Sequence, residues 1–161
     1  MKTHPFTNQE LYNFITTASK NTYAAGGKPI KKPQRPGFIE LTYKENDFSY
    51  RDSYTGFYRS RGMELVRYKS SPVWISAYGG GMVKGKEKLA KKTFEILKGA
   101  FLNRDKNFMS FRGPNIMNVG EWHYTYKQEG DVAEFSGHEE MKYRNKLVFF
   151  HRIIGGLIIH K

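Results

Sequence analysis

The chain has 161 residues, an ordinary length for one domain that buries a core of its own. Hydrophobic residues make up 39% and aromatic residues 16%, which is typical of a globular protein and excludes a disordered one. The absence of cysteine excludes disulfides, thiolate metal sites and cysteine nucleophiles. The start of the chain lacks the apolar core of a signal peptide, and the apolar run at 153–159 is too short to span a bilayer. We therefore expect a cytoplasmic protein without a membrane partner.

The charge balance is strongly basic, with 27 Lys and Arg against 15 Asp and Glu and a formal net charge of +12. Such a balance favours anionic partners, nucleic acid foremost, although a basic surface often serves solubility alone. The basic residues are dispersed and form no consecutive run typical of a nucleic-acid-binding tail. The basic residues that would carry nucleic-acid binding lie in one loop and around the second helix: Lys28, Lys31, Lys32, Arg35, Lys84, Lys88, Lys91 and Lys92.

The first half of the chain predicts one helix and several strands. Thr7 and Glu10 have the spacing of a capping box, and apolar residues follow at helical spacing, so we expect a helix over about residues 8–20. The glycine pair 26–27 ends this region, and the proline-rich basic loop up to residue 37 cannot be helical. Strands are expected at 39–44, 48–54, 63–69 and 73–78, and the three glycines 79–81 are expected to break the sheet.

The second half repeats this order. An apolar stripe at helical spacing predicts a helix over about residues 87–102. A turn is expected at 112–115. Further strands are expected at 122–127, 132–135, 139–143 and 147–154, with the last one resuming at 157–160.

A repeat underlies the two halves, because residues 61–82 align without a gap on residues 136–157. The identical positions are Gly62, Glu64, Tyr68, Val73, Gly80 and Gly81, which fall on Gly137, Glu139, Tyr143, Val148, Gly155 and Gly156. A fixed offset of this kind indicates one supersecondary unit used twice. We predict an α+β fold: an internally duplicated unit of a helix plus an antiparallel meander, with a curved antiparallel sheet and two main helices. We expect one domain over 1–161, with pseudo-repeats at approximately 7–82 and 84–158.

Two glutamates occupy matching places in the repeat. Alternation along the strands puts Glu64 and Glu139 on the apolar face, because the other face of the second copy carries His138, Glu140 and Lys142. A carboxylate on a buried face is costly unless it is hydrogen-bonded or paired. Two interpretations stay open: a pair of pseudo-symmetric carboxylates in a ligand cavity, or two structural glutamates held by tyrosine hydroxyls or loop amides.

Aromatic residues gather on the same strand faces and favour a ligand cavity. Tyrosine and tryptophan combine a large apolar area with a polar group, and together with carboxylates they bind cationic ligands. The alternatives are an aromatic β core and a platform that stacks nucleobases. The candidate ligand-binding residues are Tyr50, Asp52, Tyr54, Glu64, Tyr68, Trp74, Trp122, Tyr124, Glu139 and Tyr143.

Motifs for other chemistries are weak. The glycines 79–81 precede Lys84, Lys86 and a helix and could cradle a phosphate, but Gly155 and Gly156 recur with no helix after them. A bulge or a positive φ at a strand end explains both copies better. The five histidines show no ligand pairing, and no nucleophile elbow, phosphate loop or dinucleotide motif is present. We predict no catalytic residue, no metal and no cofactor.

Several short motifs resemble a bacterial and archaeal domain family of unknown function: the run 50–56, Gly62-x-Glu64-x-Val66-x-Tyr68, Pro72-Val73-Trp74 and Tyr78-x-Gly80-Gly81. Tyr23-x-x-Gly26-Gly27 and Arg35-Pro36-Gly37 resemble its N-terminal pattern. The family's domain occurs alone or fused to helix-turn-helix segments, so the resemblance implies a sensory or accessory role near regulation. It transfers no catalytic residue. This chain has no helix-turn-helix segment of its own, which weakens a direct action on DNA.

Three functional hypotheses follow. The first is a non-enzymatic small-molecule-binding or sensory module with an aromatic and carboxylate pocket and an unidentified ligand. The alternative is a basic nucleic-acid-binding accessory protein with weak binding. The third is a hydrolase or isomerase that uses Glu64 or Glu139 as a general base, with a pKa raised by burial. The oligomeric state is left open.

Overall fold

The computed structural model describes residues 5–105 and 108–159. Its helices are α1 (Asn8–Ser19), a π-helical turn (Lys20–Ala24), a 3₁₀ turn (Glu87–Leu89) and α2 (Ala90–Leu102). Its strands are β1 (Ile39–Glu45), β2 (Phe48–Thr55), β3 (Arg59–Tyr68), β4 (Ser71–Met82), β5 (Ile116–Val119), β6 (Trp122–Gly130), β7 (Glu134–Tyr143) and β8 (Lys146–Leu157).

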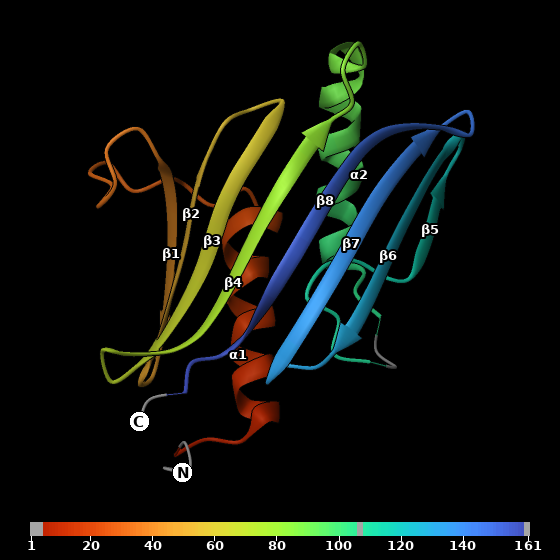
Figure 1. Cartoon of the computed structure of the whole chain (residues 1–161). Helices are drawn as coiled ribbons and strands as arrows, with labels where there is room; N and C mark the ends of the chain where they lie inside the picture. Colours follow the sequence, from red (N-terminus) through yellow and green to blue (C-terminus); the bar gives the residue numbers. More distant parts are fainter. Residues whose placement is uncertain (1–4, 106–107, 160–161) are drawn as a thin grey trace.

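The strands form one antiparallel sheet in the order β1-β2-β3-β4-β8-β7-β6-β5. Each half contributes a four-stranded meander, and the two meanders join where β4 pairs with β8. Figure 1 shows the sheet curving around both helices, which lie on the same face. The predicted α+β fold with a curved antiparallel sheet and two main helices is confirmed.

The hairpins β3–β4 and β7–β8 have matching bounds and matching irregularities. A bulge lies between Val66 and Arg67 in the first hairpin and between Met141 and Lys142 in the second, at aligned positions. The turns also match, because the positive φ angles of Lys69 and Ser70 recur at Arg144 and Asn145. Shared backbone irregularities are a stricter similarity than shared strand type, and they support the duplicated unit.

Both helices bury an apolar stripe against the sheet. The predicted capping box begins α1: the Thr7 amide donates to Glu10 Oε2 at 2.7 Å, and the Glu10 amide donates to Thr7 Oγ1 at 3.1 Å. Leu11, Phe14 and Ile15 follow on the buried face. Within the described part of the chain, no helix has the length and apolar character needed to cross a bilayer.

The glycines 79–81 do not break the sheet as predicted; they lie inside β4 and pair on both sides with β3 and β8. The strand continues because glycine tolerates the backbone there: φ is +151° at Gly80 and +134° at Gly81. A Cβ on Gly80 would lie 2.0 Å from the carbonyl oxygen of Phe150. The predicted explanation by positive φ is confirmed at these positions.

Other element boundaries differ from the prediction. The strand expected at 132–135 begins only at Glu134, and it continues without a break into the segment expected at 139–143 to form β7. The strand passes through Gly137, where the Tyr126 ring occupies the space that a side chain would need. The strand β5 was missed, since it is a short, exposed edge strand. The expected resumption at 157–160 is absent in the described residues, where β8 runs through Gly155 and ends at Leu157, and His160 lies outside them.

Candidate functional site

A cavity of about 220 Å³ lies between the first half of the sheet, the end of α1 and one side of α2. Its aromatic wall consists of Tyr23, Tyr54, Phe57, Tyr78, Phe94, Phe101 and Phe149. Its polar wall consists of Ser19, Asp52, Ser60, Glu64, Lys98, Arg112 and His151. Large apolar area with a few converging polar groups is typical of small-molecule sites.

Two buried carboxylates form part of the polar wall. Asp52 and Glu64 are direct cross-strand partners in β2 and β3, and they are 4% and 6% exposed. The hydroxyl of Tyr78 donates to Asp52 Oδ1 at 2.8 Å, and the hydroxyl of Tyr50 donates to Glu64 Oε1 at 2.7 Å. Among the described residues neither carboxylate forms an ion pair within 4.0 Å. Like charges opposite each other in a sheet are destabilising, so this pair is costly.

Asp52 holds its proton unusually tightly. Burial, and then the charge of Glu64, raise the pKa of Asp52 to about 7, although the Tyr78 hydrogen bond and Arg112 oppose the shift. Burial also raises the pKa of Tyr78, with Asp52 and Glu64 adding to the effect. The neutral form of Asp52 is therefore well populated near neutral pH.

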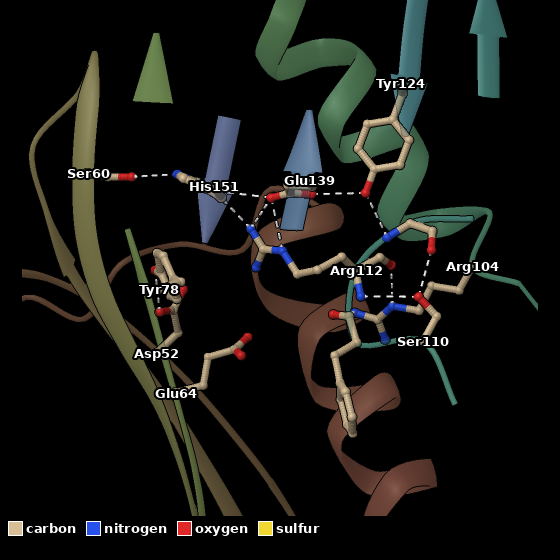
Figure 2. Close-up of polar contacts among 12 residues, drawn as sticks. Asp52, Ser60, Glu64, Tyr78, Arg104, Ser110, Arg112, Tyr124, Glu139 and His151 are labelled. Carbon is tan, nitrogen blue, oxygen red and sulfur yellow. Dashed lines mark hydrogen bonds and ion pairs between the residues drawn. The ribbon is translucent and has the colours of Figure 1, made fainter. Parts of the chain in front are cut away.

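Glu139 has a different environment from Glu64. Arg112 donates from Nε at 3.1 Å and from Nη2 at 2.7 Å to its Oε1, which also lies 3.0 Å from His151 Nδ1. The Tyr124 hydroxyl donates to Oε2 at 2.9 Å (Figure 2). Burial alone would raise the pKa of Glu139, but Arg112 and His151 outweigh it and bring the pKa to about 2. Glu139 is a fully compensated anion that lies outside the cavity wall.

Ser60 joins this cluster through His151. Its hydroxyl lies 3.2 Å from His151 Nε2 (Figure 2). The Nδ1 atom of His151 lies 3.0 Å from Glu139 Oε1, which can only accept, and 3.2 Å from Arg112 Nη2, which can only donate. In the tautomer that carries the hydrogen on Nδ1, Nε2 accepts from Ser60. The contact spans β4, since Gly80 is the cross-strand partner of both Ser60 and His151 and has no side chain to separate them. Burial lowers the pKa of His151, against the opposing effect of Glu139.

The repeat supplies an internal comparison for the carboxylate pair. In the second half, the cross-strand partner of Glu139 is Tyr126, where the first half has Asp52 opposite Glu64. Tyr126 carries no charge, and its hydroxyl donates to Gln128 at 2.8 Å. The paired carboxylates are therefore specific to the half of the sheet that lines the cavity.

Two further cavity positions of the first half, Ser60 and Tyr78, also differ from their aligned residues. Phe135 occupies the aligned position of Ser60, and Ile153 that of Tyr78. Phe135 stacks on Phe111 with ring centroids 4.3 Å apart, so aromatic packing replaces the polar group in the second half. The first half has polar side chains where the second half packs a core.

The predicted ligand-binding residues fall into three groups. Asp52, Tyr54 and Glu64 line the cavity. Three others lie behind its wall: Tyr50 bonds to Glu64, Glu139 bonds to Arg112, and Tyr124 bonds to Glu139. The structure does not bring Tyr68, Trp74, Trp122 and Tyr143 into it. Of these four, Tyr68 packs on Phe6 and Phe48, Trp74 stacks on Phe135, and Trp122 packs on Tyr143 at the far hairpin.

Several cavity residues were not indicated by the sequence. Arg112 was assigned only to a turn, and nothing in the local sequence distinguishes a buried arginine from a surface one. His151 could have been found, because alternation places it on the same inward face as Phe149 and Ile153. Ser60 and Tyr23 come from segments whose position depends on tertiary packing.

The predicted nucleic-acid residues lie in two separate places. The loop that carries Lys28 to Arg35 lies against the edge strand β1, where the amide of Ile30 donates to the Glu40 carbonyl at 2.9 Å. The segment with Lys84 to Lys92 follows the central strand β4 and leads into α2 (Figure 1). Nucleic-acid binding by these residues stays a prediction.

Comparison with protein families gives one match, the domain of unknown function DUF5680, over residues 52–158. No match was found among curated proteins or among solved structures. The matched segment begins at Asp52, so it includes the cavity residues of β2, β3, β4, α2 and β8 and omits those at the end of α1. Since this segment is well over half of the chain, the protein belongs to the DUF5680 family.

Proposed function

We propose that this protein binds a small organic molecule in the cavity next to Asp52 and Glu64, without chemical turnover. The observation that carries the proposal is a carboxylate pair without an ion-pair partner, facing the aromatic wall of a cavity. A buried pair of like charges lowers stability and contributes nothing to packing, whereas it gives a ligand a fixed polar anchor. A sensory role, in which occupancy of the cavity is transmitted to a partner, extends this proposal.

The two walls define the ligand's features. One end of the ligand carries a cationic or hydrogen-bonding group that meets Asp52 and Glu64. The body is apolar and flat, because rings such as Phe94 and Phe101 flank the space. The hydroxyl of Tyr23 has no hydrogen-bond partner in the described part of the chain and offers a further polar contact.

Binding without turnover is favoured by the state of Glu139. Its pKa of about 2 means that it stays ionised and bound to Arg112, so it cannot take a proton at neutral pH as a general base.

A library of small aromatic compounds, screened by saturation-transfer NMR against the full chain, tests the proposal. Compounds that bind the wild type should not bind the Asp52→Asn or Glu64→Gln variants. They should still bind the Glu140→Gln variant, in which the replaced glutamate lies on the opposite face of β7. Hits that bind all three variants as well as the wild type would place the ligand outside this cavity.

A second candidate function is favoured by the hydrogen-bond chain from Ser60 through His151 to Glu139. In an ester hydrolase, the Ser60 hydroxyl would attack the carbonyl carbon while its proton passes to His151 Nε2 and then to the leaving alkoxide; water would release the acid by the reverse path. This candidate ranks second because Arg112 already compensates the Glu139 charge that would stabilise a protonated His151. Covalent labelling by a fluorophosphonate, lost in Ser60→Ala, would support it.

A further inference from the structure

Not every charged group around the cavity is paired. Three buried carboxylates, Asp52, Glu64 and Glu139, lie near the buried Arg112 guanidinium and the partly buried Arg104 guanidinium. Arg112 is paired with Glu139. Arg104 donates to the Arg112 carbonyl at 2.9 Å, and its charge interacts with that of Glu64. Among the described residues, Asp52 and Glu64 have no ion-pair partner within 4.0 Å.

The groups around Asp52 come from every element packed against it. Glu64 faces it from β3, Tyr78 from β4, Tyr50 and Tyr54 from its own strand, Tyr23 from the π-helical turn, and Arg112 from the segment after α2. Lys98 of α2 also lines the cavity, but its ammonium group lies over the Tyr23 ring, 5.7 Å from the centroid. Two hydroxyls donate to the carboxylate pair, and hydroxyls satisfy oxygen atoms without supplying a positive charge.

In the absence of a cation at the pair, a proton on Asp52 removes the repulsion between the two carboxylates. The pKa of about 7 at Asp52 agrees with that arrangement, since a second negative charge beside Glu64 is disfavoured. A ligand that brings one positive charge to the pair removes the need for this proton. A neutral ligand leaves it in place.

We propose, building on the ligand-binding function above, that the occupant is a singly charged arylalkylammonium ion whose ammonium group lies between Asp52 and Glu64. The ammonium group donates to the carboxylate oxygens, and the aryl group lies among the aromatic rings of α2 and the sheet. A second positive charge on the ligand is disfavoured because the Arg112 guanidinium lies 5.4 Å from the Tyr78 ring centroid, close to the same end of the cavity.

A metal ion fits the pair less well. In the described residues no group of three or more acidic or histidine side chains is placed to hold one ion. Calcium and magnesium take six or more oxygen ligands, and two carboxylates with their hydroxyl donors do not supply that shell. An organic ammonium ion needs only the two carboxylates and an apolar body.

Isothermal titration calorimetry tests the proposal with three matched pairs: benzylammonium, 2-phenylethylammonium and 2-(indol-3-yl)ethylammonium chlorides against the corresponding neutral alcohols. At about pH 8, at least one ammonium ion should bind about tenfold or more tightly than its alcohol. Its affinity should fall by up to about tenfold per unit as the pH is lowered below about 7, because the proton competes for the pair. Titrations at about pH 6 in two buffers of different ionisation enthalpy should show release of up to about one proton.

Variants separate the outcomes. Asp52→Asn should abolish proton release and the preference for the ammonium ion, and Glu140→Gln should change neither. If an alcohol binds as tightly as its ammonium ion, or if binding releases no proton at about pH 6, the cavity binds ligands but the cation assignment is wrong. If no member of any pair binds, the cation assignment fails; if the aromatic library also gives no ligand that depends on Asp52 and Glu64, the ligand-binding function fails too.

Discussion

Asp52 and Glu64 stand directly opposite each other on β2 and β3, and each accepts a hydrogen bond from a different tyrosine. In the second half of the sheet, Tyr126 stands opposite Glu139. The comparison within one chain separates two roles for a buried glutamate. Glu139 is compensated by Arg112 and stabilises the fold, whereas Glu64 shares its surroundings with a second acid and destabilises it locally.

Replacing Asp52 by Asn should make the protein more stable above about pH 7, by on the order of 1–3 kcal/mol. The folded protein holds a proton on Asp52, whose pKa is about 7, that the unfolded chain releases near its ordinary pKa of about 4. The contribution of Asp52 to stability therefore falls as the pH rises from about 4 to about 7 and is constant above that range. Asp52→Asn should remove this slope.

Urea unfolding at a series of pH values measures the effect of Asp52→Asn. The titration of His151 affects both proteins and cancels in their difference. Asp47→Asn, in the exposed turn between β1 and β2, should follow the wild type. A variant Asp52→Asn that is less stable than wild type at about pH 8 would contradict the assignment.

Glu139→Gln should lower the free energy of unfolding by about 3–5 kcal/mol, because it leaves the buried Arg112 guanidinium without its counter-ion. Glu140→Gln should change it by less than about 1 kcal/mol, since Glu140 is half-buried and bonded only to His138. Thermal melting compares the two directly. Equal melting temperatures would show that the Arg112 pair does not hold the structure.

Gly80→Ala should lower the free energy of unfolding by about 2 kcal/mol or more, because φ is +151° and the added Cβ would lie 2.0 Å from the Phe150 carbonyl oxygen. Gly99→Ala is the matched control in α2, where an added Cβ meets nothing within 4 Å. It should stabilise the protein by about 0.5–1 kcal/mol. If the denaturant midpoints of both variants move in the same direction, the close contact between β4 and β8 at Gly80 does not require glycine.

Nucleic-acid binding should be weak and should fall steeply between low and physiological salt, as expected for dispersed phosphate contacts. Fluorescence anisotropy of labelled single-stranded and duplex oligonucleotides at the two salt concentrations measures this. Removing loop charges in Lys31→Gln with Lys32→Gln should weaken the low-salt binding without changing sequence preference. Sequence-selective, sub-micromolar binding that survives physiological salt would favour the nucleic-acid hypothesis over the cavity.

The repeat made much of the fold predictable, because alternation and a fixed offset are local properties of the sequence. The same alternation placed Glu64 and Glu139 on the buried face, where the structure has them 6% and 0% exposed. We expected Glu140 to be exposed on the opposite face, but it is half-buried beside His138. The glycines at 79–81 led to the wrong prediction of a break in the sheet, because consecutive glycines occur both in loops and in strands whose backbone has positive φ.

The cavity was less predictable than the sheet, because its polar groups come from segments far apart in the chain. Whether a buried carboxylate has a counter-ion depends on which side chains reach it from other parts of the chain. Arg112 reaches Glu139 from a loop after α2, and no arginine reaches Asp52 within 4.0 Å. The sequence therefore indicated two equivalent glutamates, and tertiary packing made them unequal.

The most direct test of the cation-binding cavity is a carbon-13 NMR titration of the Asp52 and Glu64 carboxyl groups, without and with saturating 2-phenylethylammonium or whichever ammonium ion binds tightest. In the free protein the Asp52 carboxyl resonance should show a titration step near pH 7. With the ligand bound, that step should move to lower pH by about one unit or more, because the ammonium group takes the proton's place. A bound ligand that leaves the Asp52 titration unchanged would contradict the proposed site.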